Sequence, residues 1–195
     1  MTDQVPGHLR DHFRSLGIRN EPQSASIAFL GVQQLGLLRF GPGPDGCCHY
    51  VSLGCSRHPM AEASATVADP VRGPRAEVIV SLRSGATFAG LARSLAVIAA
   101  SPAVEGSVLV EDLLVDLGAP LWQGAAFAAV LLGRSGIADL ALPYPRDPVR
   151  FLAATPITPT EAAWVRLKGS EAMRAAWIAD AVDVLDPARP ASAPA

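Results

Sequence analysis

Four side chains that can bind soft metal ions lie close together in the sequence: Cys47, Cys48, Cys55 and His58. A structural zinc site usually presents its ligands in pairs separated by about two to four residues, and only Cys55 and His58 have that spacing. Cys47 and Cys48 are adjacent, so they would point to opposite faces of a strand. We favour the interpretation that the thiols are reduced and buried as small apolar side chains, with no bound cofactor. A Cys/His metal-binding protein or enzyme stays open as an alternative.

Carboxylates that could serve in acid–base chemistry occur at Glu111, Asp112 and Asp116. They follow a predicted strand, and we interpret them as a solvated edge. Glu161 follows Thr158 in the Thr-x-x-Glu pattern of a capping box, which gives this carboxylate a structural role at a helix start. The sequence contains neither of the two Gly-rich phosphate-binding patterns, G-x-x-x-x-G-K-(S/T) and G-x-G-x-x-G. It also contains no G-x-S-x-G nucleophile elbow. The residues therefore predict a protein that is not an enzyme.

The composition is that of one folded domain. The chain has 195 residues, half of them apolar and 17% charged, and its net charge of -2 argues against a uniformly basic surface for nucleic acid. The apolar stretch 87–104 is interrupted by Arg93 and Ser94, and the stretch 124–133 is half the length of about 20 residues that a membrane helix needs. No apolar segment follows a basic start, so no signal peptide is expected. Three cysteines form no disulfide framework, and we expect a cytoplasmic protein that binds neither nucleic acid nor membranes.

The hydrophobic pattern predicts strands and helices that interleave irregularly. Strands are expected within 27–40 (one or two strands) and at 47–55, 75–83, 108–110, 127–132 and 149–154. Helices are expected at 6–16 and 87–100, and Ser101-Pro102 should end the second. Near the C-terminus, Thr158 should cap a helix that runs to Lys168, and Ser170 should cap another. The tail from Asp186 is rich in Pro and Ala, so we expect it to be frayed.

These elements indicate a single α+β domain, in which a mixed sheet is packed by helices, two of them C-terminal. An N-terminal helix and connector should occupy residues 1–24, the domain 25–187 and the Pro/Ala-rich tail 188–195. Trp122 lies in a loop-like stretch between Pro120 and Gly124. A Trp in such a place either anchors a protein partner or covers the core.

Three segments, taken in order, resemble the suppressor of fused family. Residues 50–60 read Tyr-Val-Ser-Leu-Gly-Cys-Ser-Arg-His-Pro-Met. They are similar to the family's Tyr-(Val/Ile)-(Ser/Thr)-x-Gly-x-Ser segment and to the (Arg/His)-Pro-Met continuation of its bacterial members. Residues 75–83 resemble its Arg-x-Glu-Leu strand. Residues 156–161, followed by Trp164, resemble a bacterial Pro-(Ile/Val)-x-x-x-Glu segment with an aromatic residue three positions later. The resemblance covers most of the chain, from about residue 27 to residue 187.

The resemblance implies a domain of mixed sheet and helices with no known catalytic activity. The animal member binds Gli transcription factors through a peptide added as a strand between two domains, and it restrains Hedgehog signalling. This chain resembles one such domain alone, so that signalling role is not expected of it. Bacterial relatives are often inferred to be immunity proteins that neutralise toxins by binding them, and we expect a binding module of that kind. Its candidate contact residues are Arg57, His58, Met60 and Trp122.

A structural protein that associates with itself through an edge strand of the sheet is a further alternative. The residues indicate neither the partner nor the oligomeric state.

Overall fold

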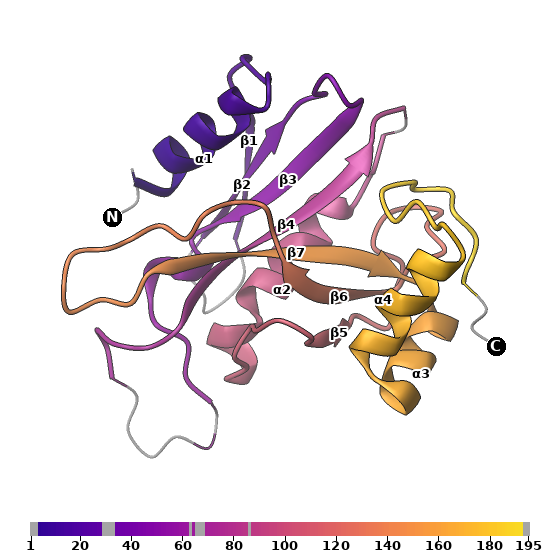
Figure 1. Cartoon of the computed structure of the whole chain (residues 1–195). Helices are drawn as coiled ribbons and strands as arrows, with labels where there is room; N and C mark the ends of the chain where they lie inside the picture. Colours follow the sequence, from indigo (N-terminus) through magenta and orange to yellow (C-terminus); the bar gives the residue numbers. More distant parts are fainter. Residues whose placement is uncertain (1–3, 29–33, 63, 65–68, 86, 193–195) are drawn as a thin grey trace.

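One mixed sheet forms the centre of the molecule (Figure 1). The structure, a computed structural model, describes residues 4–28, 34–62, 64, 69–85 and 87–192. Within them the strands are β1 (Gln23–Ile27), β2 (Leu35–Phe40), β3 (Cys47–Leu53), β4 (Arg75–Arg83), β5 (Leu114–Asp116), β6 (Ala129–Arg134) and β7 (Val149–Ile157). Their order across the sheet is β1-β2-β3-β4-β7-β6-β5. The β4–β7 pair is parallel and the other pairs are antiparallel, which confirms the predicted α+β class.

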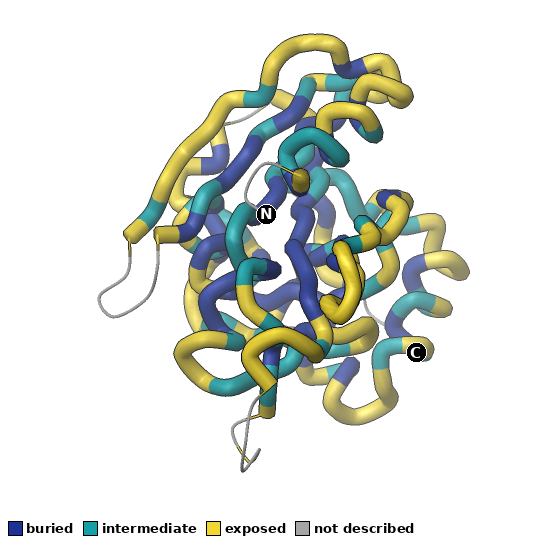
Figure 2. The backbone as a smooth tube through the Cα atoms, turned by 90° about the vertical axis from the view of Figure 1, so that its left-hand side faces the viewer, coloured by how far each residue is buried: buried dark blue, intermediate teal, exposed yellow. Residues whose placement is uncertain are grey.

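Helices cover both faces of this sheet. They are α1 (Gln4–Ser15), α2 (Leu91–Glu105), α3 (Pro159–Lys168) and α4 (Ser170–Ala179), with a short 3-10 turn η1 at Cys55–Arg57. β4 shows how the two faces form, because its successive side chains alternate between two cores. Val78 and Val80 pack with Leu95 of α2, whereas Ile79 packs with Leu9 of α1. Figure 2 shows that burial concentrates in the central strands and that exposed residues concentrate in the connections.

α2 differs from its prediction at both ends. It begins at Leu91, after Gly90 in a left-handed conformation, and it continues through Pro102 to Glu105 instead of ending at Ser101-Pro102. Proline has no N–H, so it cannot bond the carbonyl four residues before it. That carbonyl belongs to Ile98, and the Ser101 hydroxyl donates to it at 2.9 Å. This side-chain bond replaces the missing backbone bond and lets the helix run on.

Pairing between distant strands explains further differences. Residues 108–110 form no strand, whereas Leu114–Asp116 form the unpredicted strand β5 through antiparallel pairing with β6. The strands predicted at 127–132 and 149–154 are confirmed with shifted ends. The capping box is also confirmed: Glu161 N–H donates to the Thr158 hydroxyl oxygen, and Thr158 N–H donates to the Glu161 carboxylate. The predicted cap at Ser170 is wrong, because Gly169 holds that position and Ser170 is the first helical residue.

The expectation of a frayed tail from Asp186 is wrong as far as Ser192. Arg189 is 4% exposed and Ser192 is 5% exposed. The Arg189 guanidinium donates to both carboxylate oxygens of Glu161, at 2.6 and 3.0 Å, and lies over the rings of Phe127 and Trp177. A buried charge needs a partner of this kind, and here it holds the tail against α3 and α4.

In the part of the chain that the structure describes, no helix is long and apolar enough to cross a membrane.

Candidate functional site

A buried carboxylate organises the turn that follows β3. Glu77 of β4 is 0% exposed, and its oxygens accept four hydrogen bonds. Ser52 Oγ donates at 2.5 Å, Gly54 N at 2.8 Å, Ser56 N at 3.1 Å and Ser56 Oγ at 2.6 Å. Ser52 Oγ also accepts a bond from Val78 N, so the hydrogen of the Ser52 hydroxyl is directed to Glu77. One side chain therefore fixes the end of β3 and the whole of η1.

Arg75 holds the same turn from the other side. Its buried guanidinium donates to the carbonyls of Ser56 and Arg57 at 2.9 and 2.8 Å, and to that of Val71 at 3.0 Å. Gly54 lies between the two clamps with a φ of 118°, a left-handed value that L side chains rarely adopt, so a larger residue there would strain the backbone. Two charged residues of one strand thus fix the conformation of residues 54–57.

The environment of the turn shifts its titrating groups. Burial raises the pKa of the Glu77 carboxyl above its ordinary value, and its four hydrogen bonds oppose that rise. Burial raises the pKa of the Cys55 thiol well above the usual range, and the nearby Glu77 adds to the rise. A thiol with a raised pKa stays protonated at neutral pH, and the thiolate is the reactive form. Burial therefore favours the protonated, less reactive form of Cys55.

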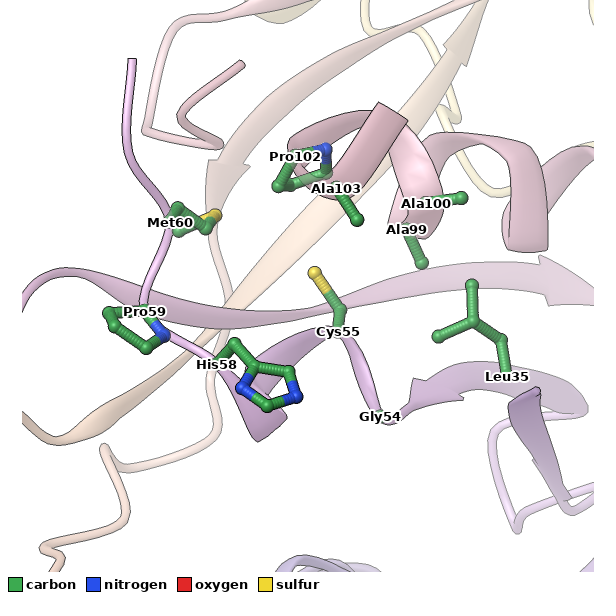
Figure 3. A pocket seen from close by; sticks show the side chains of 10 residues that line it. All are labelled: Leu35, Gly54, Cys55, His58, Pro59, Met60, Ala99, Ala100, Pro102 and Ala103. Atoms are coloured by element: carbon green, nitrogen blue, oxygen red, sulfur yellow. The ribbon is translucent and has the colours of Figure 1, made fainter. Parts of the chain in front are cut away.

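The turn borders a small apolar cavity of about 210 Å³ (Figure 3). Cys55, His58, Pro59 and Met60 supply one wall, and Leu35 and the C-terminal half of α2 supply the rest. On α2 the lining residues are small: Ala99, Ala100, Pro102 and Ala103. Figure 3 shows the Cys55 sulfur directed towards the Pro102–Ala103 end of α2, with the His58 ring turned away from it. The small side chains leave the space that the cavity occupies.

Three of the four predicted contact residues gather at this turn. Arg57 is half-buried and donates to the Gln34 carbonyl at 2.8 Å, and His58 is exposed. Met60 is buried, and its sulfur accepts from Leu109 N at 3.4 Å. Trp122 is not part of this group.

Trp122 is 6% exposed and packs between Phe88 and Phe127, with ring centroids 5.2 and 5.5 Å away. The ring therefore covers part of the core, and its interpretation as a partner contact stays a prediction. Its outer edge borders a separate hollow of about 400 Å³, which Arg93 and Val97 also line.

The four candidate metal ligands are not brought together. Cys47 and Cys48 lie at the start of β3, where the Cys47 thiol lies 3.9 Å from the Asp45 carbonyl and Cys48 accepts from Arg39 at 3.2 Å. Cys55 lies beyond the other end of that strand. Among the described residues, no group of three His, Cys, Asp or Glu side chains could hold a metal ion.

Comparison with known proteins identifies the family to which this chain belongs. A family model described as Suppressor of fused protein (SUFU) matches residues 31–190. The chain belongs to the suppressor of fused family. No curated protein matches it significantly.

Solved structures of the suppressor of fused family share the fold. A crystal structure of a SUFU (suppressor of fused protein) homolog from Neisseria gonorrhoeae FA 1090 is 18% identical, covers 98% of this chain and 96% of that chain, and has a TM-score of 0.65. A Sufu-Fu complex crystal structure is 14% identical, covers 98% and 91%, and has a TM-score of 0.68. Drosophila Suppressor of Fused is 14% identical with a TM-score of 0.68, and this chain covers half of it.

The geometry explains the suppressor of fused motifs of this chain. Ser52, Gly54 and Ser56 of the first motif are the donors to Glu77 of the second. The two motifs therefore form one hydrogen-bonded unit, whose role in this structure is to fix the turn. Sequence reasoning missed the roles of Arg75 and Glu77. The available indication was a pair of charges, Arg75 and Glu77, at the start of a strand whose following residues are mostly apolar, since charges are buried only when they have partners.

Proposed function

We propose that this suppressor of fused domain is a non-catalytic protein-binding module whose contact surface is the turn at Arg57, His58 and Met60 with its apolar cavity. One observation carries the proposal: Glu77 and Arg75 fix this turn so that exposed His58 stands at the rim of an apolar cavity. A preorganised surface loses little conformational entropy on binding. The match to a Sufu-Fu complex structure supports protein binding as the class of function.

The cavity suits one apolar side chain of a protein partner. Pockets for drug-sized molecules usually measure about 300–1,000 Å³. The volume here is about 210 Å³, and most of the lining is aliphatic. An apolar side chain that fills such a pocket is a typical anchor of a protein interface, surrounded by polar contacts at the rim. His58, which lines the cavity, and the neighbouring Arg57 would supply those polar contacts.

The partner we propose is a toxin domain that this chain neutralises in the cytoplasm. The resemblance to bacterial relatives that are inferred to be immunity proteins motivates this partner. The three free cysteines are compatible with a reducing compartment. Trp122 is a second proposed contact, at the separate hollow beside α2.

Filling the cavity tests the contact surface. Ala103 is exposed and lines the cavity, so Ala103→Phe would occupy it without disturbing the core. Val104 is the next residue, is 63% exposed and does not line the cavity, so Val104→Phe is the matched control. We expect wild type and Val104→Phe to retain a stoichiometric partner on purification from the native host, and Ala103→Phe to lose it.

The measured affinity of the identified partner then decides the proposal. Ala103→Phe should weaken it at least about tenfold relative to Val104→Phe, which corresponds to roughly 1.4 kcal/mol. Equal affinities would rule out the cavity as the contact surface. For the immunity role, co-expression with the partner should protect growth, and a partner that is harmless when expressed alone would rule that role out.

Trp122→Phe tests the second contact separately, because Phe preserves the aromatic packing with Phe88 and Phe127. A loss of about fivefold or more in affinity would support it, and an unchanged affinity would remove Trp122 from the contact residues.

A further inference from the structure

The two edges of the sheet are protected to different degrees. β5 has three residues, and its Asp116 carboxylate accepts from Arg166 of α3 at 2.5 Å. β1 at the other edge has five residues, Gln-Ser-Ala-Ser-Ile, without a charge or a proline. Folded proteins usually protect an edge by making it short, charged or covered, because its free N–H and C=O groups can pair with another chain. β5 has such protection and β1 has none of these features.

β1 is also accessible. Gln23, Ser24, Ala25 and Ser26 are exposed, and Ile27 is half-buried against the core that α2 covers, called here the α2-side core, which includes Val78, Val80 and Leu95. In the order of the sheet β1 has β2 on one side, and its outer side ends the sheet within the described residues. The small side chains along the strand leave room for a second strand to approach.

We propose that the outer edge of β1 pairs with β1 of a second copy of this chain, antiparallel about a two-fold axis through Ala25. In this register Ala25 lies opposite Ala25, Ser24 opposite Ser26 and Gln23 opposite Ile27. Each of these pairs joins two odd-numbered or two even-numbered residues. The residues whose backbone N–H and C=O groups point to the free edge therefore lie opposite the same residues of the other copy. No like charges oppose each other, and the two hydroxyl pairs can hydrogen-bond.

The second copy is favoured over another protein by the chemistry of the strand. A closed two-fold dimer needs a self-complementary surface, and this strand is self-complementary in the register above. β1 offers no charge with which to select a charged partner strand. A pairing of five residues with small side chains predicts a weak dimer, because two-stranded contacts are marginal on their own.

The register makes the dimer testable at one position. Ala25 pairs with Leu37, a residue of the α2-side core, so its exposed side chain lies on the α2 side of the sheet. Residues directly opposite in an antiparallel pair have Cβ atoms about 4.5–5.5 Å apart. A charge at residue 25 would therefore lie next to the same charge of the other copy.

Charge swapping at residue 25 tests the proposal by sedimentation equilibrium up to about 1 mM protein. Wild type should form a dimer with rising concentration. Ala25→Lys and Ala25→Glu should each weaken it at least tenfold, and an equimolar mixture of the two should restore it. Ala175→Lys and Ala175→Glu, at an exposed position of α4, carry the same charge changes as controls and should dimerise like wild type.

Three results would overturn the proposal: a wild type that is monomeric throughout, a dimer that Ala25→Lys leaves unchanged, or a mixture that stays monomeric. If the variants fail to fold, amide hydrogen exchange of the wild-type chain replaces them. Protection of the outer amides of β1 should then rise with protein concentration, and constant protection would contradict the pairing. Because the cavity beside α2 is not involved, partner binding by Ala25→Lys should be unchanged, which separates this proposal from the proposed function.

Discussion

At the scale of single residues, Glu77 determines the site by accepting hydrogen bonds from four neutral donors. Three of these bonds are buried, and the fourth, from Gly54 N, is partly buried. A buried donor without an acceptor costs about 1–3 kcal/mol. The carboxylate is therefore required by its surroundings, and its removal should affect the turn before it affects the rest of the sheet.

Glu77→Ala should lower the free energy of unfolding by at least about 3 kcal/mol, because it leaves three buried donors and one partly buried donor without their acceptor. Glu77→Gln should lower it less, since an amide oxygen at the position of Oε1 still accepts the three bonds from Gly54 and Ser56. Urea unfolding followed by Trp fluorescence measures both. Glu105→Ala, at an exposed position at the end of α2, is the control and should change stability by less than about 0.5 kcal/mol. A Glu77→Ala variant as stable as this control would contradict the clamp.

His49 gives the molecule a pH dependence near neutrality. Its ring packs against Phe13 of α1, with ring centroids 4.8 Å apart, and its Nδ1 lies 2.8 Å from Ser81 Oγ. Burial lowers its pKa below the ordinary 6.5, and His12 adds to the lowering while Asp45 opposes it. The unfolded chain thus binds a proton that the folded chain does not, and the stability contributed by neutral His49 is lost as pH falls from about 6.5 towards the folded pKa.

His49→Gln should therefore reduce the fall in unfolding free energy between about pH 7.5 and pH 5.5. The pKa of His12 is also lowered, by burial and by His8, so the double variant with His12→Gln should reduce the fall further. Urea unfolding at several pH values measures the slope. An unchanged slope in the double variant would show that other groups control this pH range.

The residue scale also shows what the sequence could predict of the site. The motif at residues 50–60 was located from its residue types, and of its three predicted contact residues His58 and Met60 line the cavity, whereas Arg57 does not. The acceptor of that motif, Glu77, was not identified, because a hydrogen bond across 21 to 25 residues leaves no local spacing pattern. The Pro and Gly neighbours of Trp122 left two interpretations open, a partner contact or a cover over the core, because its burial depends on tertiary packing with Phe88 and Phe127.

At the scale of elements, the sequence predicted those features that contacts between neighbouring residues determine. The start of α3 was predicted from its capping box, whose bonds span three residues. β5 was missed because its three residues become a strand only through β6. The packed tail was missed because Arg189 finds its carboxylate 28 residues away in the sequence. Desolvation alone would raise the pKa of Glu161, but the hydrogen bonds from Arg189, Thr158 and Trp177 outweigh it and lower that pKa. The buried ion pair makes the tail part of the α3–α4 unit.

Arg189→Ala should destabilise the chain by about 3–5 kcal/mol, because it leaves the Glu161 carboxylate buried without its guanidinium. Arg166→Ala removes an exposed pair with Asp116 and should cost less than about 1 kcal/mol, which makes it the matched control. Urea unfolding measures both, and limited proteolysis should cleave the tail faster only in Arg189→Ala. Equal stabilities and equal cleavage rates of the two variants would contradict an anchored tail.

At the scale of the whole molecule, the sheet is the shared wall of two cores. The α1-side core contains Val5, Leu9 and Phe13 of α1 together with residues of β2, β3, β4 and β7. The α2-side core uses the other face of the same strands. α1 precedes the part of the chain that matches the family, residues 31–190, and its apolar stripe is buried in the α1-side core. Loss of either helix would expose one face of the central strands to water.

Leu9→Ala in α1 and Leu95→Ala in α2 should therefore lower the midpoint of the same single unfolding transition. Both side chains are 0% exposed, and a buried Leu→Ala change costs about 2–5 kcal/mol. Leu16, 51% exposed just beyond α1, provides the control, and Leu16→Ala should cost less than about 0.5 kcal/mol. Far-ultraviolet circular dichroism and Trp fluorescence should report coincident transitions for every variant. A separate early transition in Leu9→Ala alone would mean that α1 docks as an independent element, whereas coincidence would make α1 an integral layer of the fold.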